Sequence, residues 1–150
     1  MAIAFLSVCF FLFACDRPVD TKDVLRRSFY ETVWERFDYV TSFVTVTEPT
    51  TYDLSLRIGF TDDYPYDDFS MVFAVFDSEG NPYRAKAYKF SLKDAEGRWR
   101  TESKDGCHTY TFPINKKLGI AESGTYKFVI EQTMPITPVV GVKELALIKN

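Results

Sequence analysis

Four aspartates fall within seven residues of the sequence, Asp62-Asp63-Tyr64-Pro65-Tyr66-Asp67-Asp68. Carboxylates gathered in this way could bind Ca²⁺, which takes about six to eight oxygen ligands, or could supply the acid and base of a glycosidase. The spacing does not match a calcium loop, and the glycine that such a loop needs is missing. Because Asp and Pro are common turn residues, a solvated acidic turn is the main interpretation, and a cation site is the alternative.

Cys107 and His108 are a second candidate, because a thiol activated by an imidazole is a common catalytic nucleophile. Adjacent residues on a strand point to opposite faces, so these two side chains are not expected to meet. The sequence has one histidine, and it lacks the GxSxG, GxxxxGK and GxGxxG motifs and the CxxC pairs of zinc sites. We therefore predict no catalytic residue, no metal site and no cofactor, and we expect a protein that is not an enzyme.

Cys15 follows an uncharged apolar segment. Residues 1–14 contain no Asp, Glu, Lys or Arg, and a run of this kind has the length of a secretory signal core, about 7–15 residues, rather than the roughly 20 of a membrane span. The end of the run, Leu12-Phe13-Ala14-Cys15, is similar to a bacterial lipobox, with a small residue before the cysteine. We expect residues 1–14 to be a signal peptide and Cys15 to carry the lipid.

Two further expectations follow from this N-terminal pattern. Cleavage would remove Cys9 and lipid would occupy Cys15, which leaves Cys107 without a disulfide partner. No basic residue precedes the apolar run, whereas secretory signals usually begin with one, which favours a start upstream of Met1. The alternative, a buried N-terminal strand, conflicts with the polar, proline-containing residues 16–24, which we interpret as a tether between lipid and domain.

Three aromatic residues lie in segments that are predicted to connect strands: Tyr64, Tyr66 and Trp99. Rings on loops can bind a protein partner or stack on a sugar. The alternative is that they fold back and plug the ends of the domain. An Arg98 cation over the Trp99 ring could hold that loop in place. The candidate partner-binding residues are Asp63, Tyr64, Pro65, Tyr66, Arg98 and Trp99.

The composition limits the class of protein that must position these residues. A chain of 150 residues with 46% hydrophobic and 17% aromatic residues is too apolar to be disordered, and its length suits one domain. The net charge of −3 is too small and too mixed for a nucleic-acid binder. The aromatic surplus favours β structure.

Alternation with a period of two indicates strands at 39–48, 51–60, 69–77, 83–92, 108–115, 125–134 and 142–149, with a weaker one near 25–33. The run 69–77 is apolar on both sides and is therefore expected to be a central strand. Gly80 and Gly97 mark turns, and 118–124 is expected to be a connection. About eight antiparallel strands predict an all-β sandwich of jelly-roll type over residues 25–150.

Several of these segments carry a family resemblance. They are Asp63-Tyr64-Pro65-Tyr66 followed by the strand at 69–76, the segments 90–99, 124–134 and 138–142, and the lipobox at Cys15. In their order and spacing the chain resembles the GldH family of gliding-motility lipoproteins of the Bacteroidetes, over roughly residues 52–150 and the signal.

The resemblance implies an exported, membrane-anchored lipoprotein of the cell envelope. It implies a non-enzymatic accessory role beside other gliding-motility proteins, near the type IX secretion machinery, with Cys15 as the lipid attachment site. Its expected partners are envelope proteins and, through the lipid, a membrane. The alternative is a lipid-anchored module that binds carbohydrate or peptidoglycan through the same loop aromatics.

Overall fold

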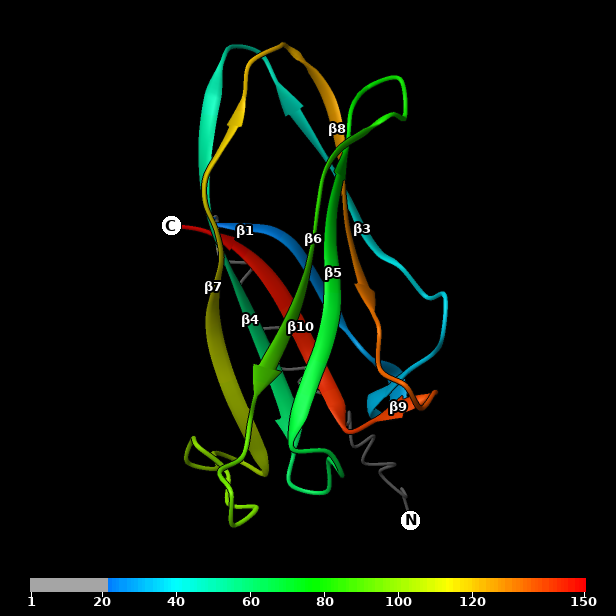
Figure 1. Ribbon diagram of the computed structural model, residues 1–150, viewed down its shortest axis with the longest axis vertical. Coiled ribbons are helices and arrows are strands. Elements are labelled where there is room, and N and C mark those ends of the chain that lie inside the picture. Colours follow the sequence, from blue (N-terminus) through cyan, green and yellow to red (C-terminus); the bar gives the residue numbers. More distant parts are fainter. Residues whose placement is uncertain (1–21) are drawn as a thin grey trace, which may run out of the picture.

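The computed structural model describes residues 22–150. These residues form ten strands and a short 3₁₀ turn at Tyr30–Thr32 (Figure 1). The strands are β1 (Asp23–Ser28), β2 (Val33–Trp34), β3 (Val40–Val46), β4 (Thr50–Thr61), β5 (Asp68–Phe76), β6 (Pro82–Ser91), β7 (Cys107–Ile120), β8 (Gly124–Gln132), β9 (Val139–Val140) and β10 (Val142–Lys149). The predicted signal peptide, Cys15 and most of the tether lie outside the described residues.

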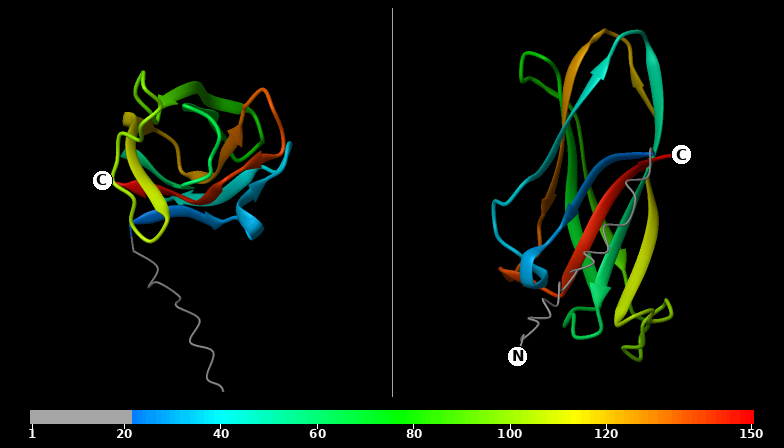
Figure 2. Two further views of the ribbon diagram at one scale, coloured as in Figure 1. Left: turned by 90° about the horizontal axis from the view of Figure 1, so that it is seen from below. Right: turned by 180° about the vertical axis from the view of Figure 1, so that it is seen from behind.

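The eight longer strands form two four-stranded antiparallel sheets. Sheet I has the order β1-β10-β4-β7 and sheet II the order β3-β8-β5-β6. The pairs β1–β10, β3–β8, β4–β7 and β5–β6 are those of one long hairpin that turns between β5 and β6 and then wraps on itself. This pairing is that of a jelly roll, so the predicted all-β sandwich is confirmed. Seen end-on, the two sheets face each other across the core (Figure 2).

The core follows from the alternation that is visible in the sequence. On β4, the five residues from Tyr52 to Phe60 at even positions are all buried, as are Tyr126, Phe128 and Ile130 on β8. Burying one such side chain contributes roughly 1.5–3 kcal/mol, so the inner faces dominate the stability of the domain. β5 is an inner strand of sheet II, between β8 and β6, as its apolar character predicts.

Three details differ from the prediction. Residues 118–120, expected in a connection, are the end of β7, because Thr50, Thr51 and Tyr52 of β4 extend the ladder along them. The strand expected near 25–33 ends at Ser28, and its start at Asp23 lies inside the predicted tether. Third, the small β2–β9 sheet was not predicted from the sequence.

Trp34 of that small sheet is fully buried and stacks on Phe29 with 4.6 Å between the ring centroids. It closes one end of the sandwich, where its indole Nε1 donates to the Asp38 carbonyl oxygen at 2.7 Å. Within residues 22–150, no helix has the length and apolar character needed to cross a membrane.

Candidate functional site

Two loops and the start of β7 meet at one end of the sandwich (Figure 1). The first loop, 62–67, joins β4 to β5, and the second, 92–106, joins β6 to β7. Their backbones are tied together, because the amides of Leu92 and Lys93 both donate to the Asp67 carbonyl oxygen, at 2.8 and 3.1 Å. All six candidate partner-binding residues lie on these two loops, so the fold brings them to one end.

Tyr64 of the first loop is buried, with 1% of its surface exposed. Its ring packs at centroid distances of 4.6 Å from Phe60 and 5.4 Å from Tyr66. Its hydroxyl donates to the Asp68 carbonyl oxygen at 2.8 Å. Burial, with a smaller contribution from the Asp68 charge, raises the pKa of the Tyr64 phenol. Tyr64 thus plugs the end of the core and presents no ring surface to a partner.

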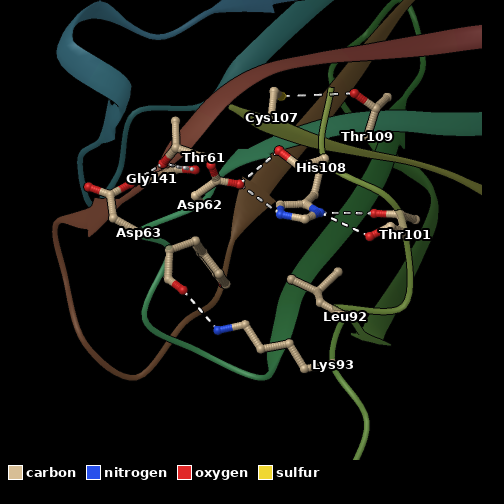
Figure 3. Close-up of polar contacts among 12 residues, drawn as sticks. Thr61, Asp62, Asp63, Leu92, Lys93, Thr101, Cys107, His108, Thr109 and Gly141 are labelled. Carbon is tan, nitrogen blue, oxygen red and sulfur yellow. Dashed lines mark hydrogen bonds and ion pairs between the residues drawn. The ribbon is translucent and has the colours of Figure 1, made fainter. Parts of the chain in front are cut away.

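Trp99 and His108 connect the second loop to β7. Their rings stack at 4.0 Å with an interplanar angle of 9°. The Nε2 of His108 lies 2.9 Å from Asp62 Oδ1, and its Nδ1 lies 3.1 Å from the Thr101 carbonyl oxygen (Figure 3). Asp62 lies on the first loop and Thr101 on the second. One histidine therefore links both loops to the same strand.

The cation over Trp99 is Lys93, which corrects the expectation for Arg98. The Lys93 Nζ lies 4.7 Å from the indole centroid. It also donates to the Tyr64 carbonyl oxygen at 3.0 Å, the dashed line from Lys93 in Figure 3. Arg98 instead forms an ion pair with Asp94, Nε to Oδ2 2.8 Å, inside its own turn. Sequence reasoning did not identify Lys93 as the cation over Trp99. In the folded chain the Lys93 ammonium lies close to both Trp99 and the backbone of Tyr64.

Cys107 and His108, the candidate thiol and base, contact different groups. Cys107 is buried, and its Sγ lies 3.9 Å from Thr109 Oγ1 (Figure 3). Both nitrogens of His108 are engaged elsewhere, as described above. Among the described residues, no hydrogen bond joins the thiol to the imidazole, which is the contact that an activated nucleophile needs.

Three of the four aspartates at 62–68 have separate side-chain partners. Asp62 accepts from Ser103 Oγ at 3.0 Å in addition to contacting His108, and Asp63 accepts from Thr61 Oγ1. Asp68 forms an ion pair with Lys89 at 2.9 Å. Between residues 22 and 150, no three His, Cys, Asp or Glu side chains are grouped so as to hold a metal ion. These carboxylates therefore take part in contacts with neighbouring residues of the same chain.

The surface of this end is formed by the remaining candidates. Asp63, Pro65 and Arg98 are exposed, whereas Tyr66 and Trp99 are half-buried. The Tyr66 ring packs against Tyr64, and the Trp99 ring stacks on His108. The arrangement is a mixed aromatic and charged surface.

A comparison with protein families shows where this fold belongs. The profile of the GldH lipoprotein family matches residues 26–147, from within β1 to within β10. The chain belongs to the GldH lipoprotein family. The GldH match begins well before residue 52, where the resemblance seen in the sequence begins, so the first three strands also belong to the family pattern.

Membership in the GldH family ties this chain to gliding motility, and its lipoprotein nature implies association with a membrane of the cell envelope. Among solved structures, this GldH chain is similar to dimeric latent PorU from Porphyromonas gingivalis, at 7% sequence identity and a TM-score of 0.38. That alignment covers 87% of the GldH chain and 11% of the PorU chain. A comparison with curated proteins finds no match.

Proposed function

We propose that this protein is a non-enzymatic accessory component of the gliding-motility and secretion machinery of the envelope, attached by lipid on Cys15, and that it binds a protein partner. The observation that carries the proposal is the family match over residues 26–147. The loop end of the sandwich supplies the proposed contact surface. Its exposed and half-buried members are Asp63, Pro65, Tyr66, Arg98 and Trp99.

The packing of this end supports a role in binding protein. Aromatic and arginine side chains contribute most to interface affinity when they are held in place before binding, because less conformational entropy is then lost. Trp99 is fixed by the stacked His108 ring and Tyr66 by the edge of Tyr64. Flat stacking of a sugar on Trp99 is disfavoured, because His108 and the Lys93 ammonium already lie against the indole.

The test is crosslinking in cells, followed by purification of the tagged protein and quantitative mass spectrometry of what copurifies. The Tyr66→Ala, Arg98→Glu double variant should reduce the copurified partners on the order of tenfold, the effect of losing about 1.4 kcal/mol of binding free energy. Arg84→Glu is the matched control, because Arg84 is also an exposed arginine but lies on β6, outside the two loops. Wild-type recovery of partners in the double variant would contradict the proposed surface.

A further inference from the structure

The centre of the outer face of sheet II is apolar without a reason in the fold. β5 alternates between buried and half-buried residues; its first outward positions, Asp68 and Ser70, are polar, but Val72, Ala74 and Phe76 are apolar. A sheet with one face toward water usually carries polar residues on that face. An apolar face in the middle of a sheet therefore indicates that something covers it.

The strand registers arrange this face in three rows across the sheet. The first row is Phe43, Lys127 and Phe76, and the second is Thr41, Val129, Ala74 and Ala85. The third is Glu131, Val72 and Ala87. Tyr39 lines the same hollow as Val72, Val129 and Glu131. Phe43 and Tyr39 are 69% and 47% exposed, so the large rings stand around a floor of small side chains.

Within the described strands, four charges lie on this face: Asp68 and Lys89 form an ion pair with each other at 2.9 Å, and the other two, Lys127 and Glu131, are arranged symmetrically. Lys127 and Glu131 lie on β8, two positions on either side of Val129 and about 13 Å apart. Among the described residues, neither has an ion-pair partner; the Lys127 Nζ lies 6.0 Å from the Phe76 centroid. A two-fold axis in the plane of the face, running along the Val129 row, exchanges the first and third rows. It places Lys127 of each copy opposite Glu131 of the other.

We propose that two copies of this chain pair face to face through sheet II about this axis. The same operation places Phe76 over the smaller Val72 of the other copy. It also places Phe43 of one copy near Tyr39 of the other. β8 then runs antiparallel to β8 across the interface, at the roughly 10 Å spacing of packed sheets. In a pair of identical copies, each Lys127 must meet a Glu131, so the two charges must lie symmetrically about the axis. A partner of another sequence would impose no such symmetry on this face.

The symmetry also suits attachment to a single membrane, a point that rests on the proposed lipid at Cys15. β1 and β3 are neighbouring edge strands of the two sheets, joined where Ser42 Oγ donates to the Val24 carbonyl oxygen at 2.9 Å. The axis runs across the strands from the β6 side to the β3 side. It therefore keeps both β1 strands, which follow the tethers in sequence, on the same side of the dimer.

The experiment uses the full chain in its native membrane and a short bismaleimide, whose reach is comparable to the roughly 10 Å between packed sheets. Ala74→Cys lies in the Val129 row, which the axis maps onto itself, and Cys107 is buried. This variant should give a crosslinked product of two copies. Thr111→Cys is the control, because Thr111 is exposed on the outer face of sheet I.

Charge exchange then tests the symmetry. In the Ala74→Cys background, Lys127→Glu or Glu131→Lys alone should lower the crosslinked fraction on the order of tenfold, because each variant brings two like charges together at both symmetric contacts. The variant that carries both substitutions should restore crosslinking. The proposal is overturned if Ala74→Cys crosslinks no better than Thr111→Cys, if the double exchange stays as low as the single ones, or if the product contains a different protein. None of these outcomes depends on whether the loop end binds an envelope partner.

Discussion

At the scale of single residues, the Tyr64 hydroxyl illustrates how a polar atom is kept inside an apolar core. The phenol is buried beneath the loop end, and its proton is shared with the Asp68 carbonyl oxygen at 2.8 Å. Burial disfavours the phenolate and raises the pKa of Tyr64 above the ordinary value near 10. Because the unfolded chain then ionises at lower pH than the folded one, the contribution of Tyr64 to stability is complete below about pH 10 and is lost as pH rises beyond it.

Tyr64→Phe should therefore change both the stability and its pH dependence. At pH 7 the variant should be less stable by about 1 kcal/mol, because the Asp68 carbonyl loses its donor. The difference from wild type should shrink as pH rises above about 10, since only the wild type loses the Tyr64 contribution there. Denaturant unfolding as a function of pH measures this. Tyr30→Phe, at an 85% exposed position, should follow the wild-type profile, and a gap that stays constant for Tyr64→Phe would refute the argument.

The residues around Tyr64 also show which part of the site could be predicted. The sequence indicates that Tyr64, Tyr66 and Trp99 lie in loops, because turn residues surround them. It does not indicate that His108 would bind Asp62 and Thr101, because these partners come from two separate loops that only the complete fold brings together. Nor does it show which cation lies over Trp99, since Lys93 and Arg98 are both close to it in sequence and Arg98 is captured by Asp94.

At the scale of secondary-structure elements, most strands were predictable because one face of each strand packs on the core, and burial imprints a period of two on the sequence. The end of β7 was missed because Gly119 and two lysines interrupt that period, although the ladder with β4 continues. β2 and β9 were missed because each has two residues, too few for a pattern. The two turns with Gly80 and Gly97 were confirmed, with φ of 85° and 76°.

Gly141 is the glycine that matters most for how these elements join. It lies between β9 and β10 at φ 91°, and a Cβ there would come within 2.9 Å of the Tyr64 Cα. Its carbonyl accepts from the Thr61 amide at 2.9 Å, and its own amide donates to the Thr32 carbonyl oxygen at 2.8 Å. The position thus combines a backbone conformation that favours glycine with a contact too close for a side chain.

Gly141→Ala should be much more destabilising than Gly97→Ala. Both substitutions place a Cβ in a left-handed conformation, at a cost of about 1–2 kcal/mol, but nothing lies within 4 Å of a Cβ at Gly97. Overpacking against Tyr64 should add about 1–3 kcal/mol at Gly141. Thermal and denaturant unfolding of the two variants measure the difference. Equal losses of stability would show that the backbone conformation alone explains the glycine.

At the scale of the whole molecule, the proposed lipid attachment and the described fold lie in different parts of the chain. The first strand begins at Asp23, and the described core begins at Leu25, well after Cys15. Cys15→Ser should therefore release the protein from the membrane fraction while its unfolding temperature stays unchanged. Cys107→Ser is the matched control, because that thiol is buried: the protein should remain with the membrane and lose some stability. A Cys15→Ser protein that stays in the membrane fraction would contradict lipid attachment at this position.

The pairing of β1 with β10 also has a consequence for the proposed export of the protein. In sheet I, β1 has β10 as its neighbour, so the first strand to be made waits for residues 142–149 before its backbone can be paired. Closing such a pair requires contacts between distant parts of the sequence, which slows folding. A chain that crosses a membrane from its N-terminus is thus kept from completing its fold until nearly all of it has passed, which is the state that a translocation channel requires of its cargo.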